Sequence, residues 1–141
     1  MRYPDEIGFT VSEEEKFLTE RREDPHAVMM LAEVDGRLAG NGGFVGIESR
    51  RKLRHRCDFC IALYRKFHRL GIGTALIAYL SKLARQAGYE QMDLEVYEDN
   101  AAALALYQKC GFIESGRLHN AVKLDDGTYR DYILMYKPLT E

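Results

Sequence analysis

The chain has 141 residues, of which 46% are hydrophobic and 30% charged, and its formal net charge is −2. This length and composition are typical of one globular domain, here residues 1–141. A small negative charge gives no general attraction to nucleic acid. No apolar run is long enough to cross a bilayer, and the first residues lack a secretion signal. Three cysteines cannot all pair with one another. We therefore expect a reduced, cytoplasmic protein that binds neither membranes nor nucleic acid.

The first half of the chain predicts one helix followed by three strands. Ser12 and Glu15 form a capping-box pattern, which predicts a helix to about Arg22, before Asp24-Pro25. Asp35-Gly36 is a strong hairpin signal. The strands are expected over Val28–Val34, Leu38–Ile47 and Cys57–Leu63. The glycines of the second strand predict a bulge or a close approach of two backbones.

The second half predicts two helices and three further strands. A helix begins near Gly71, and Gly88 suits the position after its end. Its apolar residues share one helical face: Leu76, Ile77, Leu80, Leu83, Ala84 and Ala87. Asn100 can cap a second helix, Ala101–Cys110, after which Gly111 lets Phe112 fold back on Tyr107. The remaining strands are expected over Met92–Val96, Phe112–Asn120 and Tyr129–Lys137, the last two flanking the turn Asp125-Asp126-Gly127. The fold class is therefore α+β, a mixed sheet flanked by helices.

The segment Gly71-Ile72-Gly73 has the character of a phosphate-binding loop. It follows a strand and opens a helix, whose first N–H groups and dipole favour an anion, and Lys66, His68 and Arg69 lie just before it. It fits neither common nucleotide fingerprint, because Leu76 stands where the dinucleotide motif has its third glycine, and no Lys precedes Thr74. The two glycines would also serve a plain strand-to-helix turn.

Together with the segment Asn100–Phe112, this loop resembles the GNAT superfamily of acyltransferases. The acyl-CoA loop of that superfamily, Arg/Gln-x-x-Gly-x-Gly/Ala, is matched from His68 to Gly73, with His68 in place of Arg or Gln. Its later pattern, Asn-x-x-Ala-x-x-Leu-Tyr-x-x-x-Gly-Phe, is matched from Asn100 to Phe112. The resemblance covers about residues 28–137, and the strand and helix with which such proteins usually begin are not found before Ser12. The tail, residues 116–135, is similar to bacterial members that act on free amino acids, polyamines or protein N-termini.

The resemblance implies a mostly antiparallel sheet that is splayed at an acyl-CoA site, and direct attack of an amine on the thioester. Tyr107 matches the general acid, and Asn100 matches a residue that hydrogen-bonds the pantetheine arm or nearby backbone. A backbone N–H near the end of the strand Cys57–Leu63 could hold the oxyanion. The implied acetyl-CoA contacts are Ile61, Ala62 and Leu63 for the arm, His68, Arg69, Gly71, Ile72, Gly73 and Thr74 for the pyrophosphate, and Asn100, Ala103 and Tyr107.

Other residues leave alternatives open. Glu95 and Asp58 are both candidates for the general base, and each could instead be a polar residue on a solvated face. Cys57 and Cys60 lie three apart in a strand and point to opposite faces, so we expect buried cysteines and no metal site. The basic run from Arg50 to Arg56 is expected to be a solvated loop.

The sequence thus predicts an acyl-CoA-dependent N-acetyltransferase. Its acceptor would be a small amine, or a protein N-terminus or lysine. The alternative is an acyl-CoA-binding module without catalysis, or a fragment that needs a partner. An incomplete sheet edge would favour a homodimer.

Overall fold

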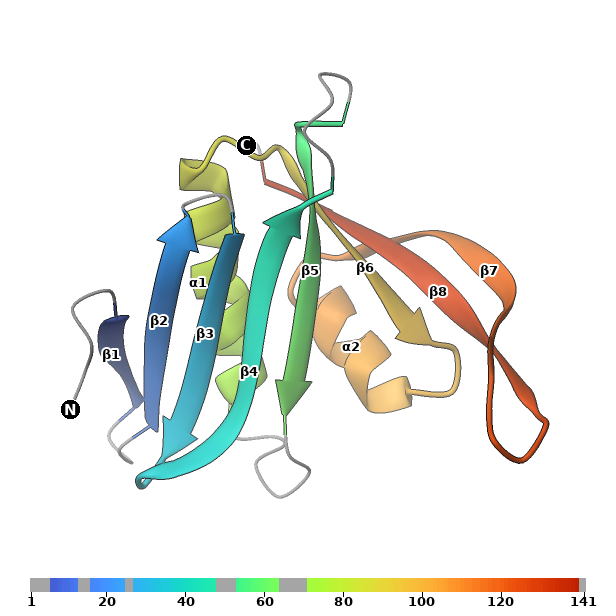
Figure 1. Ribbon diagram of the computed structural model, residues 1–141, viewed down its shortest axis with the longest axis horizontal. Helices are drawn as coiled ribbons and strands as arrows, with labels where there is room; N and C mark the ends of the chain where they lie inside the picture. The colour runs from blue at the N-terminus through green and yellow to red at the C-terminus, as the bar shows by residue number, and fades with distance from the viewer. Residues whose placement is uncertain (1–5, 13–15, 25–26, 48–52, 64–70, 140–141) are drawn as a thin grey trace.

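The computed structural model describes residues 6–12, 16–24, 27–47, 53–63 and 71–139. It contains one eight-stranded sheet and two helices, with strand order β1-β2-β3-β4-β5-β6-β8-β7 (Figure 1). The strands are β1 (Glu6–Ser12), β2 (Lys16–Asp24), β3 (Ala27–Val34), β4 (Arg37–Gly46), β5 (Arg56–Leu63), β6 (Gln91–Tyr97), β7 (Ile113–Lys123) and β8 (Tyr129–Pro138). The helices are α1 (Ile72–Gln86) and α2 (Ala101–Lys109). All neighbouring strands are antiparallel except β5 and β6, which makes the sheet mixed and mostly antiparallel, as predicted.

The N-terminal helix predicted from Ser12 to Arg22 is wrong. Lys16–Asp24 is strand β2, which pairs with β1 on one side and with β3 on the other. The capping-box pattern is a local signal, and here pairing with β3 along the whole of β2 overrides it. A strand, β1, also lies where none was found in the sequence, and no helix precedes α1 in the described ranges.

The remaining elements agree with the sequence to within a few residues, because their local signals are strong. Asp35 and Gly36 both have positive φ, of 52° and 78°, and form the tight turn between β3 and β4. After α2, the Phe112 N–H donates to the Tyr107 carbonyl at 2.9 Å and the Gly111 N–H to the Gln108 carbonyl at 3.2 Å. These are the two bonds of a Schellman ending, with Gly111 at φ 99°.

The glycines of β4 serve the close approach of neighbouring strands. A Cβ on Gly40 would lie 2.8 Å from Leu63 Cα and closer still to the Ala62 carbonyl oxygen. A Cβ on Gly43 would collide with the Val28 carbonyl oxygen. The register between β3 and β4 also shifts between Ala32 and Glu33. Both expectations from the sequence, a bulge and a close approach, are therefore confirmed.

Both helices pack on the same face of the sheet. The predicted apolar stripe of α1 is buried from Leu76 to Ala84, whereas Ala87, just after the helix, is half-buried. Tyr107 of α2 packs edge-on against Phe59 of β5, while Leu80 of α1 approaches Gly42 of β4.

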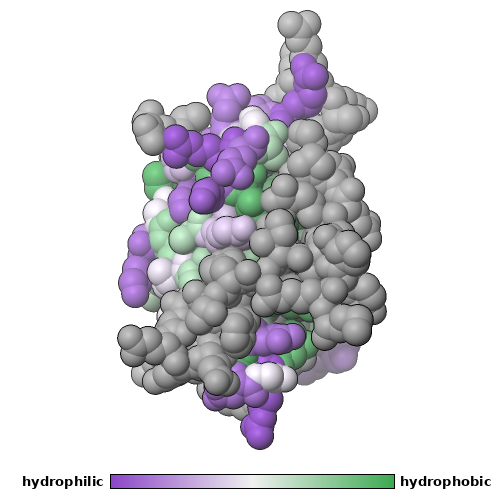
Figure 2. Space-filling model, turned by 90° about the vertical axis from the view of Figure 1, so that its left-hand side faces the viewer, coloured by the Kyte–Doolittle hydropathy of each residue, from purple (hydrophilic) through white to green (hydrophobic). Residues whose placement is uncertain are grey.

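In Figure 2, which views the molecule from the β1 side, hydrophilic side chains gather towards the top and bottom with apolar ones visible between them.

Candidate active site

The candidate site lies where the two parallel strands part. β5 and β6 pair only at Arg56–Gln91, Cys57–Met92 and Asp58–Asp93. Beyond these pairs the strands diverge, with α2 beside the gap (Figure 1). In the described ranges, the edge of β5 that faces β6 therefore has no partner strand from Phe59 to Leu63. This edge includes Ile61 and Ala62, which pair with no described strand on the side of β6, so that an extended ligand could add to the sheet there.

The first turn of α1 offers N–H groups at one end of this edge. The first intrahelical bond runs from the Ala75 N–H to the Gly71 carbonyl at 3.1 Å, so the N–H groups of Ile72, Gly73 and Thr74 have no partner within the helix. The turn has no side-chain cap and no acidic residue. An anion would therefore meet both free donors and the positive end of the helix dipole.

The two glycines of the loop are required for different reasons. Gly71 has φ 79°, and a Cβ there would meet nothing within 4 Å, so its role is conformational. A Cβ on Gly73 would lie 2.8 Å from Leu106 Cδ2 and 3.3 Å from Leu63 Cδ1. Gly73 therefore lets α1 approach α2 and β5. The loop before Gly71, with Lys66, His68 and Arg69, lies outside the described residues.

Asn100 begins α2 and is exposed. Its side-chain oxygen accepts from the Ala103 N–H at 3.1 Å, as predicted for a cap. Because the cap uses the oxygen, the amide nitrogen of Asn100 can still donate to a ligand.

Tyr107 is the only buried residue of α2 and is 8% exposed. Its ring packs against Phe59 and Phe112, with centroids 6.5 and 5.5 Å away. Burial, with a smaller effect from Cys60, raises the pKa of Tyr107 to about 12. Among the described residues its hydroxyl donates no hydrogen bond. A phenol in this setting keeps its proton at neutral pH and can act as a donor.

The opposite face of the sheet carries no helix among the described residues, and we call it the open face. It is formed near the gap by Asp58, Cys60 and Ala62 of β5 and by Asp93, Glu95 and Tyr97 of β6, which alternate with the buried residues of both strands. Cys57 is buried and Cys60 is exposed, so the two lie on opposite faces as predicted, but the expectation that both are buried is wrong for Cys60.

Two carboxylates meet on the open face at the point where the strands part. Asp58 and Asp93 are register partners. Asp93 accepts from Arg56 Nε at 2.6 Å and from Gln91 Nε2 at 2.7 Å. Partial burial and the Asp93 charge raise the pKa of Asp58, while Arg56 opposes this.

Glu95 is exposed and lies two residues beyond Asp93, where β6 no longer pairs with β5. It therefore borders the gap from the open face, whereas Tyr107 reaches the gap from the helical face. No group of three or more His, Cys, Asp or Glu in the described ranges is placed to hold a metal ion.

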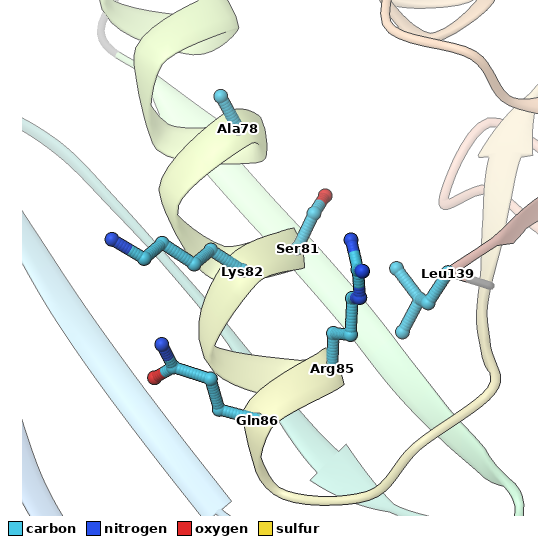
Figure 3. Close-up of a pocket in the computed structure, with 6 residues that line it drawn as sticks. All are labelled: Ala78, Ser81, Lys82, Arg85, Gln86 and Leu139. Atoms are coloured by element: carbon cyan, nitrogen blue, oxygen red, sulfur yellow. The ribbon is translucent and has the colours of Figure 1, made fainter. Parts of the chain in front are cut away.

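Two recesses of the described surface lie away from the gap. One, of about 600 Å³, is on the outer side of α1, where Arg85 extends towards Leu139 and Lys82 points away from it (Figure 3). A second, of about 170 Å³, lies between α2 and the β7–β8 hairpin.

Sequence reasoning missed three residues of this region. Asp93 was overlooked because its pairing with Asp58 depends on a register between distant strands. Tyr97 and Tyr132 stack with centroids 5.6 Å apart and planes at 10°, and no local pattern links them. Alternation along β6 would have placed Tyr97 on the same face as Glu95.

Comparison with known proteins agrees with this architecture. A model of the acetyltransferase (GNAT) family matches residues 3–112. The chain is 33% identical over 106 residues to an N-alpha-acetyltransferase of Sulfurisphaera tokodaii, which covers 70% of this chain and 64% of that protein. It is 37% identical over 82 residues to the [ribosomal protein bS18]-alanine N-acetyltransferase of Escherichia coli, covering 58% of this chain and 55% of that protein. The chain thus matches between about half and two thirds of the length of these relatives.

A GNAT-family acetyltransferase structure from Streptococcus pneumoniae superposes with a TM-score of 0.77 at 27% identity, over 82% of this chain and 69% of the other. The chain belongs to the GNAT family of acetyltransferases. The family match begins at residue 3 and so includes β1 and β2. Neither helix in the described part of the chain has the length and hydropathy of a membrane-spanning segment.

Proposed function

We propose that the chain is a single-domain cytoplasmic N-acetyltransferase that transfers the acetyl group of acetyl-CoA to a primary amine. The observation that carries the proposal is the parting of β5 and β6 after Asp58 and Asp93, beside the uncapped first turn of α1. The edge of β5 from Phe59 to Ala62, which pairs with no described strand on the side of β6, suits the pantetheine arm. The N–H groups of Ile72, Gly73 and Thr74 suit the pyrophosphate. The Asn100 amide suits a carbonyl of the arm.

The proposed reaction is a direct transfer. The amine nitrogen attacks the thioester carbonyl, a C–N bond forms, and the C–S bond breaks. Glu95 accepts the proton that the amine loses. A backbone N–H at the end of β5 supports the oxyanion. Tyr107 donates a hydrogen bond to the departing sulfur. Because an ordinary cysteine thiol has a pKa of 9.0 and the Tyr107 phenol a pKa of about 12, the phenol acts first as a hydrogen-bond donor and keeps its proton.

Calorimetric titration with acetyl-CoA and a thiol-release assay on a mixed panel of amines test the proposal. Tyr107→Phe and Glu95→Gln should each lower kcat by roughly 10²-fold or more, with the affinity for acetyl-CoA unchanged within about twofold. Tyr129→Phe is the matched control, because Tyr129 is 47% exposed and begins β8, outside the part of that strand that pairs with β6.

Three outcomes separate the alternatives. Binding with thiol release that depends on Tyr107 supports the enzyme. Binding without turnover on any amine supports an acyl-CoA-binding module or a fragment that needs a partner. Failure to bind acetyl-CoA rejects the assignment of the gap and of the α1 turn.

A further inference from the structure

Arg117 of β7 joins two carboxylates on the helical face of the sheet. Its Nε donates to Asp131 Oδ2 at 2.7 Å, and its Nη2 donates to Glu98 Oε2. Arg117 is the register partner of the buried Ile133, which places it on the face that carries α2. Asp131 lies on β8, whereas Glu98 is the first residue after β6. One guanidinium therefore ties the end of β6 to the β7–β8 hairpin.

Backbone groups hold Glu98 in the same place. The Glu98 N–H donates to the Asp131 carbonyl at 3.1 Å, and the Asp131 N–H donates back to Glu98 Oε1 at 3.2 Å. Glu98 thus uses one carboxylate oxygen for Asp131 and the other for Arg117. The Asp131 side chain is 15% exposed and that of Glu98 32%. Charges that are partly shielded and share their partners hold a geometry better than a single exposed ion pair.

Strand β7 departs from regular pairing opposite Asp131. Its register with β8 shifts between Leu118 and Val122, so the residues between them bulge opposite Asp131. Asn120, in this bulge, has φ 48°, and its N–H donates to Asp131 Oδ1 at 2.8 Å. The Asn120 bond, and then Arg117, lower the pKa of Asp131, so its side chain is a carboxylate at neutral pH. The bulge and the left-handed Asn120 both serve to satisfy this one carboxylate.

The segment tied down by Arg117 leads directly into α2. The Asn100 N–H donates to the Tyr97 carbonyl at 3.0 Å, which closes a turn over Glu98 and Asp99. Arg130 Nε also donates to Asp99 at 3.0 Å, but the Asp99 side chain is 58% exposed, and a pair so exposed contributes little. The position of Asn100 therefore follows that of Glu98.

The beginning of α2 is weakly packed. Its first two residues are exposed, and Tyr107, towards its other end, is its only buried residue. A helix of nine residues is too short to be stable alone in water. A recess of about 170 Å³, lined in part by Glu98, Leu104 and Arg117, lies between α2 and the hairpin. Without the bonds of Arg117, the start of α2 has room to move.

We propose that Arg117 is a positioning residue that fixes the start of α2 through Glu98 and so places the Asn100 amide for acetyl-CoA. This inference rests on the proposed function, in which Asn100 donates to the pantetheine arm. Arg117 acts through Asn100 and needs no contact with the ligand. Its loss removes no group that binds acetyl-CoA, but it frees the first turn of α2 to fray and shift.

Calorimetric titration with acetyl-CoA compares Arg117→Met with the wild type. We expect the Kd to rise roughly three- to tenfold, the effect of misplacing one neutral hydrogen bond to a ligand. Arg117→Lys keeps the charge but lacks the planar fork, so it should recover only part of the affinity. Lys123→Met is the matched control, because it removes a cation from the same strand, where Lys123 lies over the Tyr129 ring. It should change the Kd by less than twofold.

Asn100→Ser tests whether Arg117 acts through Asn100. Serine keeps the cap, loses the amide donor and adds no charge. In the Asn100→Ser background, adding Arg117→Met should change the Kd by less than twofold, because the group that Arg117 places is already absent. A merely structural role of Arg117 would weaken binding by the same factor in both backgrounds.

Hydrogen exchange measured by NMR follows the start of α2 without any ligand. The Leu104 N–H donates to the Asn100 carbonyl at 3.0 Å, and the Phe112 N–H closes the other end of the helix. In Arg117→Met, the Leu104 N–H should exchange about tenfold faster than in the wild type, and the Phe112 N–H should change by less than twofold. Urea unfolding verifies that each variant is folded.

The proposal is overturned if Arg117→Met weakens binding equally in both backgrounds, if Lys123→Met weakens it as much, or if the Leu104 and Phe112 N–H groups are accelerated alike. Unchanged affinity in Arg117→Met, with a wild type that binds, rejects the positioning role alone. A wild type that does not bind acetyl-CoA rejects the proposed function instead, and the exchange of the Leu104 N–H then decides whether Arg117 holds the start of α2.

Discussion

At the scale of single residues, burial acts in the same way on Cys57 and Tyr107. Each is held in the core beside the gap, and each has its pKa raised to about 12. For Tyr107 this keeps the proton in place for its proposed role. For Cys57, burial is the largest cause of the raised pKa, and the carboxylates of Asp93 and Asp58 raise it further. The Cys57 thiol also donates to the Gln91 carbonyl across the β5–β6 junction, so it belongs to the structure that holds the strands together.

The Cys57 thiol predicts an alkaline loss of stability. In the unfolded chain it ionises from its ordinary pKa of 9.0, and in the folded chain only at about 12. Its contribution is therefore complete below pH 9 and is lost as pH rises towards 12, because the unfolded state binds fewer protons. Between pH 8 and pH 10 the loss should be about 1.4 kcal/mol.

Urea unfolding of wild type and Cys57→Ala at pH 8, 9 and 10 measures this contribution. The variant should be less stable at pH 8, because a small cavity replaces the sulfur, but its stability should fall less with pH. Equal slopes for the two proteins would contradict the assignment of the effect to Cys57.

At the scale of elements, Asn100 has two separable duties. Its oxygen caps α2 through the Ala103 N–H, and its amide nitrogen is proposed to bind the pantetheine arm. Asn100→Ala should cost about 1 kcal/mol of stability and also weaken acetyl-CoA binding. Asn100→Asp keeps the cap but loses the donor, so stability should be retained while the Kd for acetyl-CoA rises. Chemical denaturation and calorimetry together test this, and unchanged affinity in Asn100→Asp would limit Asn100 to capping.

The pairing of β4 with β5 depends on Gly40. A Cβ at this position would lie within 3 Å of the Leu63 backbone and meet the Ala62 carbonyl oxygen. Gly40→Ala should therefore destabilise the protein by about 3 kcal/mol and weaken acetyl-CoA binding, since it displaces the strand that faces the gap. Gly116→Ala is the matched control, because its nearest neighbour atom is 3.9 Å away. Similar urea midpoints for the two variants would show that β5 can move to accept the methyl group.

Local signals were enough to predict the helices and strands from Val28 onwards. The features that could not be predicted depend on contacts between segments that are far apart in the sequence. The turn at Asp35-Gly36, the Asn100 cap and the Gly111 ending are all encoded within a few residues, and each is found in the structure. The segment Ser12–Arg22 carried a helical start signal, yet its described part from Lys16 onwards is a strand that pairs with β3. The meeting of Asp58 with Asp93 and the stacking of Tyr97 on Tyr132 likewise depend on register. The motifs were therefore enough to predict the gap. The residues that lie together on the open face could be identified only from the folded structure.

At the scale of the whole molecule, the sheet has two wings joined at a short junction. One wing is β1–β5 with α1, and the other is β6, α2, β7 and β8. Three register pairs connect β5 to β6, whereas seven connect β6 to β8. A pantetheine arm in the gap would add contacts to both wings at once, so ligand binding and the stability of the junction should be linked.

Hydrogen exchange with and without acetyl-CoA tests this linkage. Bound acetyl-CoA should slow exchange most in Phe59–Leu63 of β5 and in Leu94–Tyr97 of β6, and leave the outer part of the β7–β8 hairpin nearly unchanged. At a ligand concentration of 100 times the Kd, global stability should rise by about 2.7 kcal/mol. Equal protection in every strand would mean that the molecule opens as one unit and that the junction has no special weakness.

The short junction also bears on how the chain could be divided. The connection from α1 to β6 passes through exposed Gly88, at φ 99°, and each piece made by cutting there keeps its own antiparallel strands. The contacts between the pieces include the three register pairs of β5 with β6, the ion pair of Arg56 with Asp93, the bond from the Cys57 thiol to the Gln91 carbonyl, the packing of Phe59 on Tyr107 and Phe112 and of Phe44 on Tyr89, and the bond from Lys137 to Ser81. Two such fragments, expressed separately, would reassociate most firmly when a thioester ligand lies between them, so a reporter fused to each fragment would read the concentration of acetyl-CoA.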